Sequence, residues 1–202
     1  MRTVFLTRFC AVPFFLCILI AELASCATTK MGTPIYHVYI TNTRRVAVLP
    51  PSALDSTVDQ LYQLKLSYKD DDFSILAYVS ADKTAINIVM LSDFGTEVGA
   101  ISYTADGISA TALPDSLPAK YIIMDFQNAF YALDALHETY ATARLNFTEV
   151  PIDHSDAASG ATTVRTIRDG NKIIETITYA GNVITIANHL RGYTYTLTGA
   201  SE

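Results

Sequence analysis

The sequence predicts a mainly β domain of the α+β class. We expect a strongly curved antiparallel sheet, or half-open β-barrel, with one central amphipathic helix as its lid. Three observations lead to this prediction. Short segments alternate apolar and polar residues, which is the period of a half-buried strand. Short polar turns separate these segments at the spacing of hairpins. One stretch in the middle instead repeats its apolar residues every three or four positions.

The first half of the predicted sheet is a meander of five strands. The alternation is clearest in "YQLKLSY", residues 62–68, and "FSILAYV", residues 73–79, with three aspartates forming the turn between them. The remaining strands are predicted over residues 86–91, 97–103 and 108–113. Because the turns between them are short, neighbouring strands should run antiparallel.

One helix is predicted over residues 119–142. Its apolar side chains, such as Ile122, Phe126 and Leu136, fall on one side, whereas Asp125, Asn128, Asp134 and Glu138 fall on the other. The apolar side must be buried, and the concave side of the curved sheet is the simplest place for it. Ordinary two-layer packing of the helix on a flatter sheet is the alternative.

The chain after this helix returns to strands. They are predicted over residues 143–152, 162–168, 172–180, 183–190 and 193–198. Asp169-Gly170-Asn171 and Gly181-Asn182 are strong hairpin signals between them. The whole prediction is nine or ten strands and one long helix in a single β domain, residues 57–202.

The N-terminus has the pattern of a signal peptide, predicted over residues 1–25. Arg2 and Arg8 precede a short apolar run, and small residues follow it. Leu23-Ala24-Ser25-Cys26 resembles the bacterial lipobox, so Cys26 is the predicted lipid attachment site and the chain is expected to be anchored to a membrane by lipid. Residues 26–56 would then be an acylated N-terminus and a tether or lead-in segment. A retained membrane anchor and cleavage after Ala27 are the alternatives.

Composition narrows the classes of function. The formal net charge is −6 with no cluster of basic residues, which argues against a nucleic-acid partner. Cys10 and Cys17 would leave with the leader, so the exported chain would have no internal disulfide. Its four histidines lack metal-ligand spacing, and Ser109 and Ser159 lack the motif of a nucleophile. We therefore expect no enzyme activity, no metal and no cofactor.

The apolar residues that face inward suggest a cavity for a hydrophobic ligand. The candidate lining residues are Leu64, Leu66, Ile75, Ile86, Ile88, Ile101, Phe126, Phe130 and Leu133. Phe94, at an expected hairpin tip, is a candidate for membrane contact. The alternative is that these side chains fill a closed core. A hydrolase that acts on acyl chains would also need a nucleophile and a base, which no motif indicates.

The helix segment "YIIMDFQNAFYALDAL" and the terminal "NHLRGYTYTL" resemble a bacterial lipoprotein family of unknown function that is related in fold to the LolA/LolB lipoprotein carriers. The resemblance covers about Gln60 to Thr198. It implies a half-open β-barrel whose apolar cavity is covered by helices. Family members often accompany genes for aryl polyene synthesis and a soluble LolA-like protein, which is the implied donor partner. Ala27 instead of Asp after Cys26 implies the periplasmic face of the outer membrane of a Gram-negative bacterium.

The function expected from the sequence is an outer-membrane lipoprotein that binds or accepts acylated or lipid-like molecules. The resemblance connects this function with aryl polyene or lipid transport to the outer membrane. The alternative is a structural or assembly lipoprotein of the envelope that binds a protein partner, for which a sheet edge would be the natural surface.

Overall fold

A computed structural model describes residues 35–69, 71–113, 118–152 and 162–200, and its main element is a sheet of ten antiparallel strands. The strand order is β7-β6-β5-β4-β3-β12-β11-β10-β9-β8, so the sheet is open, with β7 and β8 at its edges. The strands are β3 (Val58–Tyr68), β4 (Asp71–Ala81), β5 (Ile86–Leu91), β6 (Glu97–Thr104), β7 (Gly107–Thr111), β8 (Asn146–Ile152), β9 (Thr162–Asp169), β10 (Lys172–Ala180), β11 (Val183–Asn188) and β12 (Tyr193–Gly199).

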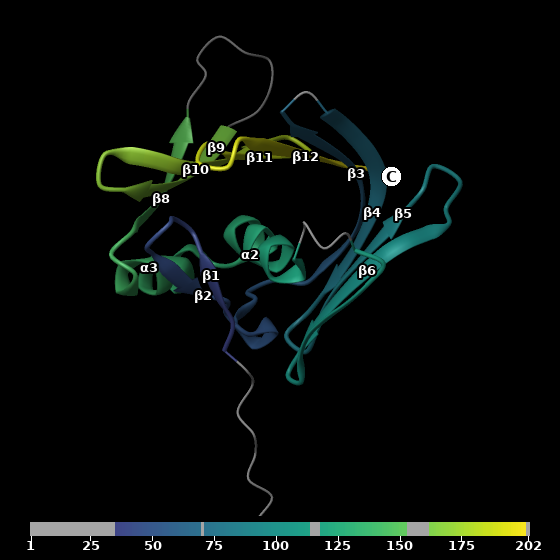
Figure 1. The fold of residues 1–202 in the computed structure, drawn as a ribbon, viewed down its shortest axis with the longest axis horizontal. Helices are drawn as coiled ribbons and strands as arrows, with labels where there is room; N and C mark the ends of the chain where they lie inside the picture. The colour runs from purple at the N-terminus through teal and green to yellow at the C-terminus, as the bar shows by residue number, and fades with distance from the viewer. Residues whose placement is uncertain (1–34, 70, 114–117, 153–161, 201–202) are drawn as a thin grey trace, which may run out of the picture. The chain divides into compact units, whose positions relative to one another are not determined.

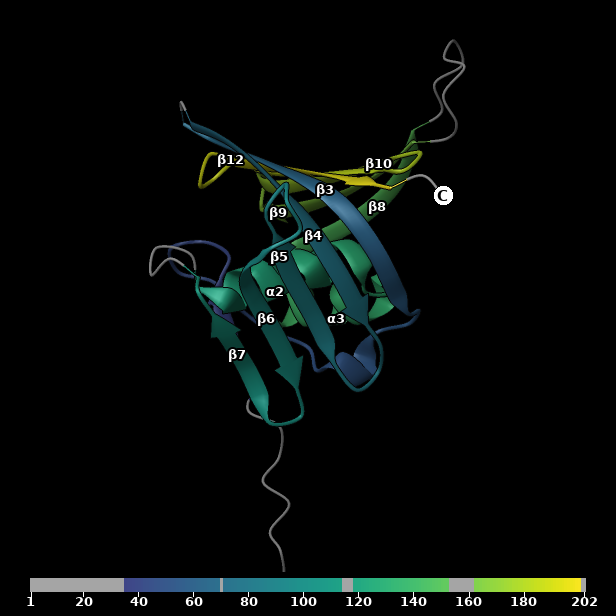
Figure 2. The ribbon, with the colours of Figure 1, turned by 90° about the vertical axis from the view of Figure 1, so that its right-hand side faces the viewer.

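The sheet bends strongly where its two halves join. β12, the last strand in the chain, pairs with β3, and this single ladder connects the meander β3–β7 to the strands β8–β12. In Figure 1 the two halves lie at a steep angle to each other, with α2 (Ala119–Phe130) in the bend. Figure 2 shows β4 to β7 side by side across one side of the same helix. The predicted mainly β, antiparallel and curved sheet is confirmed.

The prediction of one helix over residues 119–142 is wrong, because two helices occupy this stretch. α2 ends at Phe130, and α3 (Leu133–Thr142) begins after a break at Tyr131 and Ala132. The backbone of Tyr131 is extended, with φ −82° and ψ 157°. Its buried side chain points to the segment before β3, where the hydroxyl donates a hydrogen bond of 3.1 Å to the carbonyl oxygen of Pro50. Tertiary contacts therefore end the helix where no Pro or Gly marks an end.

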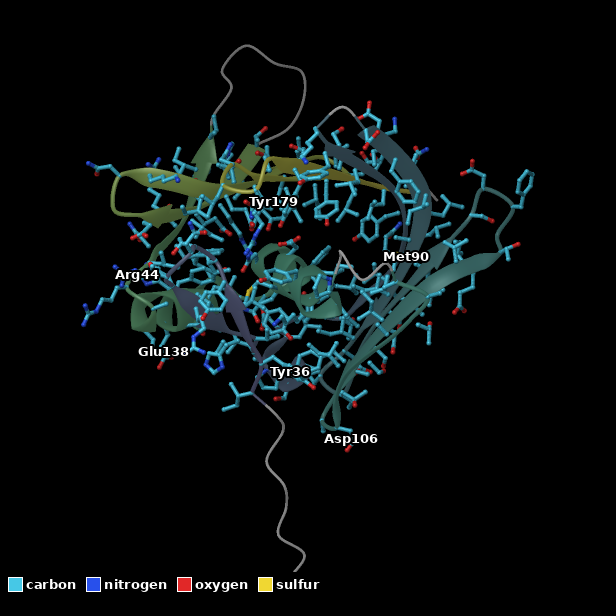
Figure 3. All side chains as sticks on the ribbon, viewed as in Figure 1. Tyr36, Arg44, Met90, Asp106, Glu138 and Tyr179 are labelled. Atoms are coloured by element: carbon cyan, nitrogen blue, oxygen red, sulfur yellow. The ribbon has the colours of Figure 1, made fainter. Side chains whose placement is uncertain are left out.

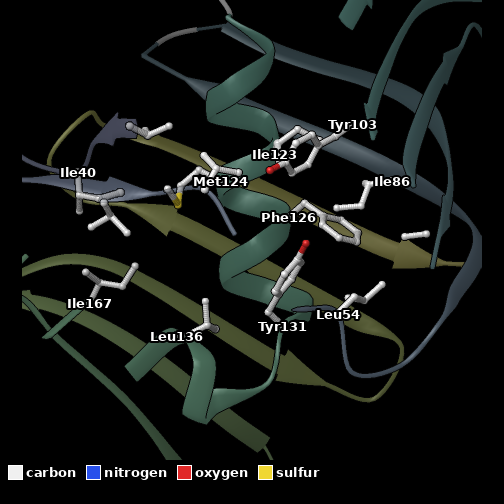
Figure 4. Close-up of a cluster of buried hydrophobic side chains, with 14 of the residues drawn as sticks. Ile40, Leu54, Ile86, Tyr103, Ile123, Met124, Phe126, Tyr131, Leu136 and Ile167 are labelled. Carbon is white, nitrogen blue, oxygen red and sulfur yellow. The ribbon is translucent and has the colours of Figure 1, made fainter. Parts of the chain in front are cut away.

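The core surrounds α2, as Figure 4 shows. Ile123, Met124 and Phe126 project from this helix into a cluster with Tyr103 from β6 and Leu136 from α3. All five side chains are buried, so α2 is covered on several sides, as expected for a helix in the bend of a sheet. No helix in the described part of the chain is long and apolar enough to cross a bilayer.

The segment before β3 belongs to the packed domain. β1 (His37–Tyr39) and β2 (Arg45–Ala47) form a separate two-stranded sheet, followed by the short 3-10 helix η1 (Pro51–Ala53). Val38, Val46 and Leu54 are buried in the main core cluster. This part of the expected lead-in segment thus contributes apolar side chains to the same core as the predicted β domain, residues 57–202. The predicted signal peptide and Cys26 lie outside the described residues.

Candidate functional site

An apolar cavity lies between α2 and the inner face of the bent sheet. Its volume is about 110 Å³, and almost all of its surface is contributed by carbon atoms. We call it the inner cavity. Its lining comes from α2 and from strands of both halves of the sheet: Leu64, Leu66, Phe73, Ile75, Ala77, Val79, Ile88, Met90, Ile122, Asp125, Phe126, Phe130, Ile186, Tyr195 and Leu197.

A wider pocket of about 780 Å³ adjoins the inner cavity, and we call it the outer pocket. The two share six lining residues: Leu66, Phe73, Ile75, Met90, Asp125 and Tyr195. The outer pocket adds the more polar residues Tyr68, Tyr121, Arg191 and Tyr193, together with Val98, Ala112, Leu113 and Pro118. The shared residues make one depression that is apolar at its inner end and partly polar at its outer end.

Alternate residues of β4 and one face of α2 form much of the wall of the inner cavity. On β4, the alternate residues Phe73, Ile75, Ala77 and Val79 point to the same side of the sheet. On α2, the cavity-facing residues are spaced three or four apart, from Ile122 through Phe126 to Phe130. The rings of Phe126 and Phe130 stack with their centroids 4.6 Å apart. In Figure 3, Met90 lies on the inner side of the sheet, beside α2.

A buried polar network joins α2 to the second half of the sheet. The side-chain amide of Asn128 donates to one oxygen of the Glu175 carboxylate at 3.0 Å, and the amide of Asn188 donates to the other at 3.0 Å. The hydroxyl of Tyr140 on α3 donates to the side-chain oxygen of Asn128 at 2.6 Å. Burial raises the pKa of the Glu175 carboxyl, whereas the two amide hydrogen bonds lower it. These contacts fix α2 against β10 and β11.

Asp125 lies where this network meets the pockets. The hydroxyl of Tyr193 donates to both carboxylate oxygens, at 3.1 and 3.0 Å. Burial raises the pKa of the Asp125 carboxyl well above its ordinary value, and the nearby Glu175 raises it further. The hydrogen bond from Tyr193 and the charge of Arg191 act in the opposite direction. Burial outweighs both, so the neutral form of Asp125 is favoured over a wider pH range than in water.

The C-terminal end of α2 is held by side chains from β9 and β10. One guanidinium nitrogen of Arg165 donates to the carbonyl oxygens of Asn128, Ala129 and Tyr131 at 2.9, 3.1 and 3.0 Å. The hydroxyl of Tyr179, labelled in Figure 3, also donates to the carbonyl oxygen of Ala129 at 2.6 Å. A cation at the negative end of a helix is favourable, and the carbonyls there lack partners within the helix.

The structure brings six of the nine predicted cavity residues together. These are Leu64, Leu66, Ile75, Ile88, Phe126 and Phe130. Ile86 and Ile101 do not line the cavity and are instead buried in the main core cluster, and Leu133 packs against that cluster at the start of α3. Phe94 is 96% exposed in the turn between β5 and β6. A role in binding or membrane contact remains a prediction for all of them.

Several residues of the site were not predicted. The helical pattern assigned Asp125 and Asn128 to the solvent side with Asp134 and Glu138, but only the latter pair is exposed. The burial of the first pair depends on partners distant in sequence, such as Glu175. Tyr195 and Leu197 were detectable, because they alternate on one side of the last predicted strand.

The described histidines do not gather at the two pockets. No group of three or more His, Cys, Asp or Glu side chains in the described ranges has the arrangement of a metal site. His37, His137 and His189 are exposed and lie outside both pockets, and His154 lies outside the described residues. The depression offers an apolar end and a polar end, which suits an amphiphilic molecule.

Fold and site together define a mainly β protein with an open, bent sheet and an apolar pocket beneath its central helix. A family model described as "Protein of unknown function (DUF3261)" matches residues 59–201, and the chain belongs to this family. The match extends from β3 through β12, so it includes every described strand and helix that contributes to the two pockets. No curated protein matches the chain.

Proposed function

We propose that this protein is a lipid-anchored carrier or acceptor of acylated or lipid-like molecules at the periplasmic face of the outer membrane. The observation that carries the proposal is the inner cavity, an apolar space that remains beneath α2 in an otherwise packed domain. Close packing is the rule in protein interiors, so an unfilled apolar space joined to a larger pocket favours a ligand site over a closed core.

The proposed ligand places its chain in the inner cavity and its polar end in the outer pocket. Each methylene group removed from water contributes about 0.8 kcal/mol, so a short length of chain suffices for binding. α2 is the lid in this proposal, and the bent sheet corresponds to the half-open barrel of LolA/LolB-like carriers. Transfer between two such proteins needs no covalent step, because the chain exchanges one apolar pocket for another.

The proposed anchor is Cys26 after removal of the signal peptide. Support comes from the lipobox pattern and from the apolar run before it. In this arrangement the pocket is held next to the membrane that receives the ligand, and a soluble LolA-like protein is the donor. Phe94 is an additional membrane contact in this proposal, since its exposed ring would be shielded from water by lipid.

Binding of a fluorescent fatty acid tests the carrier proposal. The chain without its predicted signal peptide, residues 26–202 with Cys26→Ser, is purified without detergent and titrated with cis-parinaric acid, and saturable binding near one ligand per chain is expected. Phe126→Asp, which places a charge in the apolar wall, should weaken binding at least tenfold. Phe94→Ser is the matched control, because this aromatic side chain lies outside both pockets. Absence of saturable binding by a folded protein would contradict the proposal.

An assembly lipoprotein that binds a protein partner is the second candidate. The observation that favours it is the open edge of the sheet at β7, where Ser109, Ala110 and Thr111 are exposed. An unpaired edge can accept a strand from another chain. Replacing Ala110 with Pro should abolish a partner complex in this case and leave fatty-acid binding unchanged.

A further inference from the structure

The outer pocket contains a cation held in a defined position. Arg191 lies in the turn between β11 and β12, and its backbone amide donates to the side-chain oxygen of Asn188 at 2.9 Å. Its guanidinium carbon lies 4.6 Å from the ring centroid of Tyr121 on α2, and one guanidinium nitrogen donates to the carbonyl oxygen of Tyr39 on β1. The backbone of Arg191 is thus held by β11, and its side chain is oriented by α2 and β1.

The charges around Arg191 favour an anion in the pocket. Among the described residues that line the outer pocket, Arg191 is the basic residue and Asp125 is the acidic residue. The side-chain ion pairs of the described ranges are Arg44 with Asp169 and Arg165 with Glu149, so neither includes Arg191. Both oxygens of Asp125 accept a hydrogen bond from Tyr193, and burial favours the uncharged form of this carboxyl. The wall of this pocket therefore presents a cation that has no side-chain ion pair within the described ranges, in a protein whose overall charge is negative.

Two lysines lie at the rim of the same pocket. The ammonium group of Lys69 is 5.0 Å from the ring centroid of Tyr68, and that of Lys120 is 5.7 Å from the ring centroid of Tyr121. Both tyrosines line the outer pocket. Neither lysine is among the described residues that line the pocket, whereas Arg191 is. Arg191, in the pocket wall, is therefore the residue that distinguishes this end of the depression.

We infer that the ligand is an acid, with a carboxylate or phosphate head group in the outer pocket bound by the guanidinium of Arg191. This inference rests on the proposed function, because it assigns the polar end of the same ligand. A guanidinium presents several donors in one plane and can bind two oxygens of such a head group together. The arrangement places the acidic group next to the apolar cavity that receives the chain.

Matched acid and ester probes test the inference. The Cys26→Ser protein is titrated with cis-parinaric acid and with its methyl ester, which has the same chain without the charge. The acid is expected to bind at least tenfold more tightly, and Arg191→Met should remove this preference while leaving the affinity for the ester unchanged. Arg44→Met is the control. It should keep the preference, because Arg44 lies outside both pockets and pairs with Asp169.

Competition identifies the head group and separates the possible failures. Displacement of the bound probe by dodecanoate, dodecyl phosphate and dodecanol is compared, and the better anion is the preferred head group. Equal affinity of the Cys26→Ser protein, with Arg191 unchanged, for the acid and the ester would overturn the inference and leave the carrier proposal intact. This measurement does not depend on the folding of any position-191 variant. Retention of the preference in Arg191→Met would also overturn it. If neither probe binds, the proposed function itself fails.

Discussion

The two sides of α2 pack against the bent sheet in different ways. On the side of β9, β10 and β11, hydrogen bonds from Arg165, Tyr179 and the Asn128–Glu175–Asn188 network hold the helix. On the side of β3, β4 and β5, the contacts are apolar. The unfilled cavity lies there and extends to Ile186 on β11 and to Tyr195 and Leu197 on β12. The helix is therefore held by hydrogen bonds on one half of the sheet and by apolar packing on the other half. In the proposed function, the ligand lies on the apolar side of α2 and leaves these hydrogen bonds in place.

Loss of the Arg165 guanidinium should have the largest effect on the attached side. Arg165→Met removes the donor of the carbonyl oxygens of Asn128 and Tyr131 and of the Glu149 carboxylate, and leaves Ala129 with the Tyr179 hydroxyl alone. We expect the free energy of unfolding to fall by about 3 kcal/mol, as measured by urea denaturation. The control is Arg45→Met on β2, an exposed side chain whose loss should cost less than about 0.5 kcal/mol. Equal effects of the two changes would show that the attachment of α2 does not depend on this contact.

The same substitution at two positions on β4 compares the unfilled cavity with the packed core. Ala77 lines the inner cavity, whereas Ala81, on the same side of the same strand, is buried in the packed core. Ala81→Leu should lower the free energy of unfolding by about 1–3 kcal/mol, because a packed core resists added volume. Ala77→Leu should be close to neutral and should weaken fatty-acid binding at least tenfold. Denaturation and probe titration measure both, and a similar cost at both positions would contradict the presence of the cavity.

Asp125 lies at the boundary between the two sides of α2. Its carboxyl should make the free energy of unfolding depend on pH, and we expect this effect to be smaller. Its pKa is raised in the folded protein by burial, so folding favours the protonated form. This contribution to stability is complete below the pKa of the unfolded chain and is lost as pH rises through the higher folded value. For one proton the slope is at most about 1.4 kcal/mol per pH unit.

Asp125→Asn removes this group and should flatten the fall in unfolding free energy above about pH 4. The measurement is urea denaturation at several pH values between 4 and 8, with Asp134→Asn on the exposed side of α3 as the matched control. Parallel curves for wild type and Asp125→Asn would contradict a raised pKa at this position.

Prediction from the sequence succeeded where a pattern is local. The alternation in β3 and β4 placed Leu64, Leu66 and Ile75 on the inner side of the sheet, and the helical period placed Phe126 and Phe130 opposite them. It failed at Tyr131, because the apolar period continues through the break between α2 and α3 while the backbone does not. It also assigned Asp125 to the solvent side, because its partners lie on β12 and β10, far along the chain.

Local sequence patterns were enough to predict the mainly β class, the antiparallel hairpins and most of the inner face of the sheet, because each depends on neighbours a few residues apart. The tertiary structure decided where the helix breaks, which carboxyl groups are buried and where the packing leaves a cavity. Each of these features depends on contacts between residues that are far apart in the chain. Tyr131 contacts Pro50, Glu175 contacts Asn128, and the pairing of β12 with β3 lets both halves of the sheet line one cavity. Whether a polar side chain faces water or an internal partner is settled only when that distant partner is in place.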